Sequence, residues 1–304
     1  MKFSRDLGWY IWSTAFYLVP GGIQAVLFPW LIAVYLMESP TRVGIAQMAG
    51  PLPMLFLILF GGWLGDRVDQ RKLSVNLSLA MMVPPLLMVV LSLTDNVTYE
   101  LLIAWVILAG TLAAFAQPAR DAMLNRVAGQ DVQQIVTLVI GVQFGVQILG
   151  FAVGSSADVM GPAAVLGCMA AFMLLSALVT RQLPPMPAET ASDHSGSPLR
   201  EIKEGLLVAW NHQKIRPAII MIFGVGLFFA SAYMVILPLM VRDIYDGGAR
   251  GIAMAYGANM LGICVEFLGV RNAVLVAGAG MIILLLYLLV RTRLYEVRRN
   301  PVIA

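Results

Sequence analysis

Residues 61–72 read Gly-Gly-Trp-Leu-Gly-Asp-Arg-Val-Asp-Gln-Arg-Lys and lie between two long apolar stretches. Asp66 and Arg67 open the hydrophilic part of this segment, and Arg71 and Lys72 close it. Apolar stretches of this length are typical of transmembrane helices, and basic loop residues favour the cytoplasmic side of a membrane. We therefore predict a short cytoplasmic loop between two membrane-spanning helices.

The composition of the chain is that of a polytopic membrane protein. Of its 304 residues, 60% are hydrophobic and 12% are charged, and the mean hydropathy is +0.83. A helix crosses the hydrocarbon core, roughly 30 Å thick, with about 20 apolar residues. We predict an all-α, polytopic membrane helical bundle with one short membrane segment near 251–265. Its eight full spans lie near 9–36, 44–64, 73–94, 101–118, 132–156, 160–181, 217–241 and 272–290.

The Lys and Arg residues predict which loops are cytoplasmic. Up to residue 216, they concentrate in the loops on the side of the amino terminus, whereas the opposite loops hold only Arg42. The amino terminus is therefore expected in the cytoplasm. The tail after residue 290 is also basic, which favours a cytoplasmic carboxyl terminus. That requires the segment 251–265, about 22 Å long as a helix, not to cross the membrane.

This topology divides the chain into three regions. Residues 1–182 form an N-terminal six-helix transmembrane bundle, and residues 217–304 form an incomplete C-terminal bundle with a basic tail. Residues 183–216 form a cytoplasmic linker, which is rich in Pro, Ser and Ala over 183–198. Apolar residues recur at helical spacing over 199–213, which predicts an interfacial amphipathic helix.

Two loops resemble those of a known transporter superfamily. Residues 61–73 closely resemble the signature loop between the second and third helices of the major facilitator superfamily. The stretch 116–124, Ala-Gln-Pro-Ala-Arg-Asp-Ala-Met-Leu, is similar to the link between the fourth and fifth helices of its enterobactin-exporter and macrolide-efflux subgroup. Asp69 fits the loop of that subgroup, whereas Gln70 replaces its usual basic residue. The resemblance implies two halves of six helices that work by alternating access.

The second half resembles the superfamily only in parts. Residues 238–248 look like the outer loop between the seventh and eighth helices, and residues 267–271 look like the start of the twelfth. We therefore expect a complete N-terminal half and a partial C-terminal half. On this interpretation, about three to four helices are absent near Cys264.

The resemblance also implies a conformational hinge. In the superfamily, the counterpart of Asp66 engages the start of the eleventh helix and helps to close the inner side of the outward-facing state. We expect Arg120 to be a local partner for Asp66, since both are expected at the cytoplasmic face. The alternative is that the basic residues only fix the topology. The candidate hinge residues are Gly62, Asp66, Arg67, Asp69, Arg71, Lys72 and Arg120.

Polar residues near the middle of the spans are candidates for the substrate pathway, because they are costly in lipid. Gln24 follows Pro20-Gly21-Gly22, which can interrupt the first helix. Gln143 and Gln147 lie one turn apart and share a face of the fifth span, and Asn259 is a further candidate. The alternative role for these residues is hydrogen bonding between helices.

The fifth span also carries two Gly-x-x-x-Gly pairs, Gly141/Gly145 and Gly150/Gly154, which predict close helix packing. Drug antiporters usually have a Gly-Pro motif in this region, and Phe151 stands at the position of the proline. No Asp or Glu is expected at the midplane of the first six spans. Protons as the coupling ion therefore follow from the family resemblance alone.

These features predict a secondary active transporter of the major facilitator superfamily in the bacterial inner membrane. We expect an exporter of drugs, siderophores or other small amphipathic molecules. The alternative is an internally deleted, non-transporting membrane protein. Phosphate-binding loops, paired catalytic carboxylates and metal-ligand clusters are not apparent, so we predict no enzyme, no cofactor, no metal site and no nucleic-acid partner. Cys168 and Cys264 lie in apolar stretches and are expected to pack there.

Overall fold

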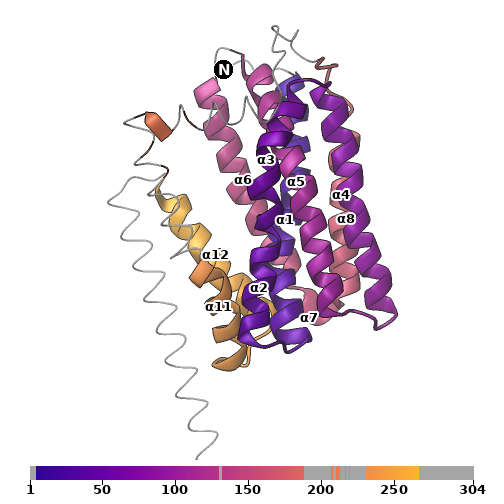
Figure 1. Ribbon diagram of the computed structural model, residues 1–304, viewed down its shortest axis with the longest axis vertical. Coiled ribbons are helices and arrows are strands. Elements are labelled where there is room, and N and C mark those ends of the chain that lie inside the picture. Colours follow the sequence, from indigo (N-terminus) through magenta and orange to yellow (C-terminus); the bar gives the residue numbers. More distant parts are fainter. Residues whose placement is uncertain are drawn as a thin grey trace, which may run out of the picture. The chain divides into compact units, whose positions relative to one another are not determined.

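The computed structural model describes residues 5–129, 132–187 and 231–266, together with residues 207, 210–212, 216 and 219. Within these ranges every regular element is a helix (Figure 1). The helices are α1 (Arg5–Trp30), the π-helical turn η1 (Leu31–Tyr35), α2 (Pro40–Ala49), α3 (Pro51–Gly65), α4 (Gln70–Leu93), α5 (Tyr99–Ala128), α6 (Val132–Gly154), α7 (Ala157–Met160), α8 (Pro162–Thr180), α11 (Ser231–Asp243) and α12 (Ala249–Glu266).

The all-α membrane bundle expected from the sequence is confirmed for the part of the chain that the structure describes. Six helical segments there are long and apolar enough to cross a membrane. They coincide with the first six predicted spans and lie at Arg5–Tyr35, Pro40–Gly65, Gln70–Leu93, Tyr99–Ala128, Val132–Met160 and Pro162–Thr180. The chain is therefore an integral membrane protein.

Side-chain caps fix where several of these helices begin. Ser39 accepts a hydrogen bond from the backbone N–H of Arg42 at the start of α2 (3.4 Å). Asp69 accepts one from Lys72 at the start of α4 (3.0 Å), and Thr98 starts α5 in the same way. Ser, Thr and Asp are favoured at this position because the first N–H groups of a helix lack partners within it.

The first span is the centre of the bundle. Of its most apolar window 72% is buried, against 17% for the second span. α1 packs against α6 and α8, α4 packs against α8 and α5, and α3 packs against α5 (Figure 1). Because other helices surround α1, most of its apolar side chains are buried.

Glycine allows α1 and α6 to approach closely. A Cβ atom on Gly150 would lie 2.6 Å from the Val19 carbonyl oxygen and 2.7 Å from the Gly22 Cα atom. Gly154 similarly lies against Ile23 and Val26 of α1. The second Gly-x-x-x-Gly pair therefore packs as predicted. A Cβ atom on Gly141 or Gly145, the first pair, would meet nothing within 4 Å in the described part of the chain, so the packing predicted for this pair is not seen there.

The irregularity expected at Pro20-Gly21-Gly22 is not present. α1 continues through these residues without interruption, and Gly22 lies at the contact with α6. The helix changes its geometry only at η1. Beyond it, Met37 has a left-handed backbone (φ 51°), and the Glu38 N–H donates to the Ile32 carbonyl (3.1 Å). This is a helix-ending turn of the kind usually built on glycine.

A second difference concerns residues 116–124, which were expected to link two helices. They lie inside α5, which runs on to Ala128 with Pro118 within it. The helix is 30 residues long, and the next one starts at Val132. The polar side chains of this stretch therefore sit on a helix that continues beyond the predicted span.

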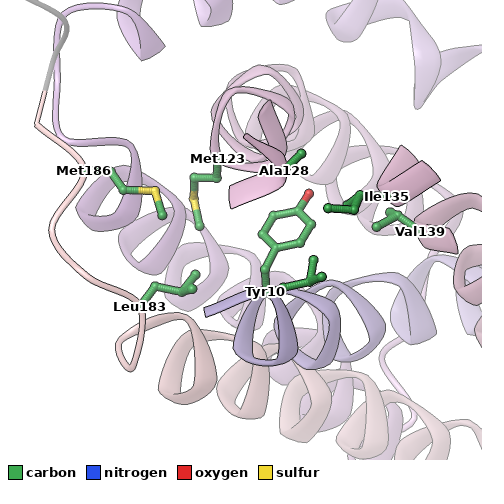
Figure 2. Close-up of a cluster of buried hydrophobic side chains, with 8 residues drawn as sticks. Tyr10, Met123, Ala128, Ile135, Val139, Leu183 and Met186 are labelled. Carbon is green, nitrogen blue, oxygen red and sulfur yellow. The ribbon is translucent and has the colours of Figure 1, made fainter. Parts of the chain in front are cut away.

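Apolar side chains close one end of the bundle, which we call the hinge end because it holds the loop between α3 and α4. Figure 2 shows Tyr10 beside Met123, Ala128 and Ile135, with Leu183 and Met186 from the segment after α8. The backbone N–H of Gln70, at the start of α4, donates to the Met186 carbonyl (3.1 Å). The opposite end, which holds the turn after η1, is called the Glu38 end.

The chain divides into two compact units at Ala253/Met254, within α12. α12 has 18 residues, about 27 Å at helical rise, and extends beyond both ends of the predicted segment 251–265. It is not among the helices that are apolar enough to cross a membrane. The predicted span 272–290, most of the linker, the basic tail and the side chain of Asn259 lie outside the described residues.

Candidate functional site

The loop at the hinge end is held at both of its ends. Asp66 follows α3, and its backbone N–H donates to the Gly62 carbonyl (3.1 Å). Asp69 caps α4, and Lys72, whose N–H it accepts, has an exposed side chain. Arg71 donates to the Leu183 carbonyl (2.8 Å). The loop therefore ties α3 and α4 to the segment that follows α8.

Asp66 and Arg67 differ in their surroundings. The Arg67 guanidinium lies 4.2 Å from the centre of the Trp63 ring and donates to the Trp63 carbonyl (3.4 Å). The Asp66 side chain is exposed, and no hydrogen bond or ion pair holds its carboxylate among the described residues. An anion at the C-terminal end of a helix is unfavourable to the helix dipole. A cationic or N–H partner for Asp66 would therefore be stabilising.

Arg120 does not pair with Asp66, contrary to our expectation. Its side chain is buried, with the residue 2% exposed, among hydroxyl groups of α1 and α4. The guanidinium donates to Ser13 and Thr14 (both 3.1 Å) and to Ser74 (3.3 Å). A guanidinium with donors on three sides binds such a set of acceptors well.

Further contacts extend this buried cluster to α8. The Arg120 guanidinium lies 4.2 Å from the centre of the Tyr17 ring, and the Tyr10 hydroxyl donates to the Arg120 carbonyl (3.2 Å). Ser13 is 2.7 Å from the hydroxyl of Thr180. The Arg120 cluster therefore links α1, α4, α5 and α8. Its hydroxyl residues were missed from the sequence, because single Ser and Thr residues are common in apolar helices.

The candidate pathway residues of α1 and α6 do not form one hydrogen-bonded set. Gln24 and Gln147 are half-buried, and Gln143 is exposed. Their side chains make no hydrogen bond within the described part of the chain, so the alternative role of bonding between helices is not seen there. The backbone of Gln147 contacts Gly22 at the crossing of α1 and α6.

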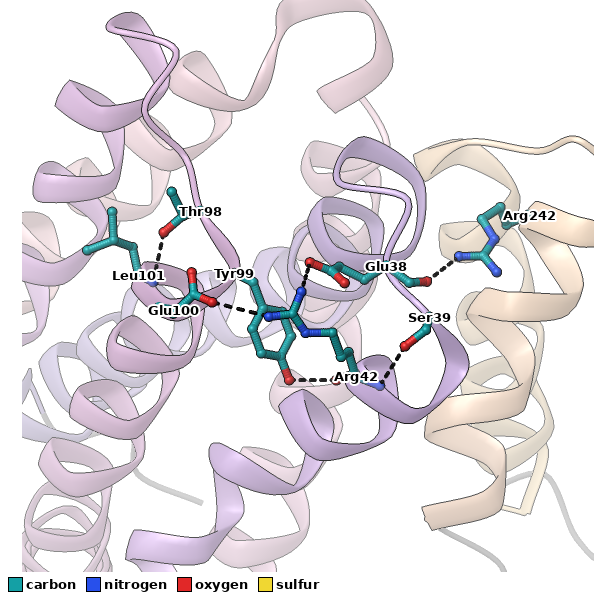
Figure 3. A network of polar contacts seen from close by, with 8 residues as sticks. All are labelled: Glu38, Ser39, Arg42, Thr98, Tyr99, Glu100, Leu101 and Arg242. Atoms are coloured by element: carbon teal, nitrogen blue, oxygen red, sulfur yellow. Dashed lines mark hydrogen bonds and ion pairs between the residues drawn. The ribbon is translucent and has the colours of Figure 1, made fainter.

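A polar network that was not predicted lies at the Glu38 end (Figure 3). Arg42 donates to the carboxylates of Glu38 (2.7 Å) and Glu100 (3.2 Å), and its guanidinium lies 4.1 Å from the centre of the Tyr99 ring. The Tyr99 hydroxyl donates back to the Arg42 carbonyl (2.9 Å). The start of α5 is thereby joined to the turn between η1 and α2. Arg42 had been noted only as a basic residue on the less basic side.

Comparison with known proteins supports the fold and gives the family. The structure resembles an auto-inhibited peptide transporter of the POT family (TM-score 0.50, 12% identity, 86% of this chain and 58% of that one). It also resembles PepTSo, a transporter of the same family (TM-score 0.51, 14% identity, 87% of this chain and 59% of that one). The chain thus spans less than two thirds of the length of these solved structures.

At this level of identity the structural similarity supports the fold alone. No curated protein matches the sequence. The sequence model of the transmembrane secretion effector family matches residues 3–262, which is most of the chain and includes both the hinge loop and the Arg120 cluster. The protein therefore belongs to the transmembrane secretion effector family, within the major facilitator superfamily of transporters.

Proposed function

We propose that the chain is a secondary active exporter of small amphipathic molecules such as drugs or siderophores. It works by alternating access between two helical bundles in the bacterial inner membrane, with the hinge end and both termini in the cytoplasm. Family membership, the six helices of membrane length and the resemblance of the hinge loop support this proposal. Protons are proposed as the coupling ion on the family resemblance.

The observation that carries the proposal is the geometry of the hinge loop. Asp69 and Arg71 fix its backbone, while Asp66 presents an exposed carboxylate at the end of α3. The helix dipole disfavours that charge, so a partner that binds it gains free energy. A fixed loop with such a carboxylate is suited to bind another segment in one conformation and to release it in the next.

Gln24, Gln143 and Gln147 are proposed to line the substrate path, together with Asn259. The three glutamines lie on α1 and α6, the helices that cross at Gly22 and Gly150, whereas Asn259 belongs to α12. Polar side chains are costly inside a membrane unless they meet a partner or a water-filled path, so these amides are suited to bind a passing substrate.

Export from energised, everted membrane vesicles tests the proposal with a panel of dyes, macrolides and siderophores. We expect accumulation that disappears when the proton gradient is collapsed. Asp66→Asn should lower its rate about tenfold, because the amide loses the charge on which the hinge contact depends.

Asp95→Asn is the matched control. Asp95 is also an exposed carboxylate in a short turn, and its left-handed backbone (φ 53°) suits Asn equally well. This variant should transport as the wild type does. Equal rates for the two variants would remove the role of Asp66. If the vesicles accumulate no compound of the panel, the competing proposal of a non-transporting protein gains support. The chain covers 58% of the length of a solved transporter, which fits that alternative.

A further inference from the structure

Arg242 in the last turn of α11 reaches the end of the first span. Its guanidinium donates to the carbonyls of Ala33 (3.0 Å) and Glu38 (2.8 Å), and Figure 3 shows the bond to Glu38. The side chain of Arg242 is only 13% exposed. α11 also packs against η1 and α2 at this end. Arg242 therefore lies within a contact between the first six spans and α11.

The acceptors of Arg242 are carbonyl groups at a helix end. The last carbonyls of a helix have no partner within it and carry the negative end of its dipole, so a cation is favourable there. The left-handed conformation of Met37 reverses the chain and turns the Glu38 carbonyl toward the same guanidinium. A bond from a charged donor is stronger than one between neutral groups.

Asp158 makes the converse contact. It lies in α7, and its carboxylate accepts the backbone N–H of Arg250 in the first turn of α12 (3.3 Å). An anion is favourable at this end of a helix. A Cβ atom on Gly248 would collide with the carboxylate oxygens of Asp158, so this position leaves room for the contact only as glycine.

From these two contacts we propose that Arg242 and Asp158 form a reciprocal latch that holds the Glu38 end closed. Each charged side chain caps a helix terminus across the contact, the cation from α11 onto η1 and the anion from α7 onto α12. This rests on the proposed alternating-access function, in which the Glu38 end must open to release substrate. The latch sets the balance between the closed and open states of that end.

The surroundings of the latch suit reversible use. Arg42 holds Glu38 and Glu100 together, so the receiving side of Arg242 moves as one body with α5. Arg242 also donates to the neighbouring carboxylate of Asp243, and this bond lowers the pKa of Asp243. Because Asp243 lies on the same helix, it stays with Arg242 when the latch opens. The guanidinium therefore never loses all of its partners.

Disulfide formation across the contact of α2 and α11 can measure the closed state. A Cβ atom on Gly44 would lie 4.0 Å from both γ-carbon atoms of Val235, so side chains at these two positions face each other across the contact and a pair of cysteines there can report its closure. The test protein carries Gly44→Cys and Val235→Cys, with Cys168 and Cys264 replaced by Ser and a protease site inserted within 188–198. After cleavage, a cross-linked chain stays at full length on a non-reducing gel.

We expect rapid cross-linking in this background and a roughly tenfold slower rate after Arg242→Gln or Asp158→Asn, since about 1.4 kcal/mol corresponds to a factor of ten in population. Arg250→Gln is the matched control. It removes an exposed charge from the same turn of α12 but keeps the N–H that Asp158 accepts. This variant should cross-link at the background rate.

Gly248→Ala provides a second route to the result if either charge variant fails to fold. Its methyl group displaces the Asp158 carboxylate without changing any charge, so it should slow cross-linking as well. Background rates for Arg242→Gln, Asp158→Asn and Gly248→Ala would overturn the latch. Cross-linking is scored without substrate, so a chain that exports nothing but shows the expected rates would refute the proposed function and leave the latch standing.

Discussion

A buried guanidinium needs an acceptor for each of its donors, and the surroundings of Arg120 supply hydroxyl oxygens and an aromatic face instead of a carboxylate. Burial of a charge costs several kcal/mol unless such partners are in place. Hydroxyl groups of α1 and α4 offset this cost where the two helices contact α5. Arg120 therefore acts on the stability of the bundle.

We predict that Arg120→Gln destabilises the protein by about 2–4 kcal/mol, because the shorter neutral side chain leaves buried hydroxyls unpaired. The readout is the apparent Tm of the purified protein in detergent, followed by tryptophan fluorescence. Arg181→Gln, at an exposed position after α8, is the control and should leave the Tm unchanged. A similar Tm for both variants would contradict the structural role of Arg120.

Arg120 could be singled out from the sequence, but its partners could not. The motif around residues 116–124 marked it as a candidate, and its charge placed it near the cytoplasm. Its acceptors Ser13 and Ser74 lie 107 and 46 residues away, and hydroxyls carry no periodic signal in apolar helices. The pairing depends on which helices are neighbours, which a local pattern does not encode.

Pairs of adjacent glycines show how the helices set their spacing. A Cβ atom on Gly61 of α3 would overlap the Ala114 carbonyl of α5, whereas one on Gly62 would meet nothing within 4 Å. The same hinge-loop sequence therefore contains one glycine required by packing and one that is not. Small residues at helix contacts in membranes allow backbones to approach in this way.

At this scale we predict opposite results for the two glycines. Gly61→Ala forces α3 away from α5 and should lower the unfolding free energy by about 1–3 kcal/mol. Gly62→Ala should leave stability unchanged or raise it by up to about 1 kcal/mol, since Ala favours a helix. Chemical unfolding in mixed micelles compares them. Equal losses would show that the α3–α5 crossing is looser than the structure has it.

The existence of helices was easier to predict than their ends. The length of the apolar stretches located the first six spans, because a helix must present about 20 apolar residues to cross the hydrocarbon core. An interruption was expected at Pro20-Gly21-Gly22 and a link between helices at residues 116–124, yet α1 and α5 continue through these stretches. Neighbouring helices can support the local geometry around a proline. The glycine spacing on α6 predicted that Gly150 packs closely against another helix, but the sequence did not show that Gly22 of α1 lies opposite it.

For the whole molecule, the proposed orientation places the hinge end in the cytoplasm. The test starts from a protein in which Cys168 and Cys264 are replaced. One cysteine at a time is then introduced at Lys72 or Asp95, two exposed residues at opposite ends of α4. We expect an impermeant thiol reagent to label Asp95→Cys in intact cells, and Lys72→Cys only after permeabilisation, because basic loops stay inside. The reverse pattern would invert the topology and the proposed direction of export.

The Arg120 cluster also bears on how the chain is made. Ser13, Thr14, Tyr17 and Ser74 all precede Arg120 in the sequence, so the ribosome delivers them first. A charge on an inserting helix is costly, by up to about 2.5–3.5 kcal/mol when it lies at the helix centre. When α5 enters the bilayer, the acceptors that lower this cost are already there, and only Thr180 arrives later. Synthesis order thus lets the buried charge be assembled during insertion.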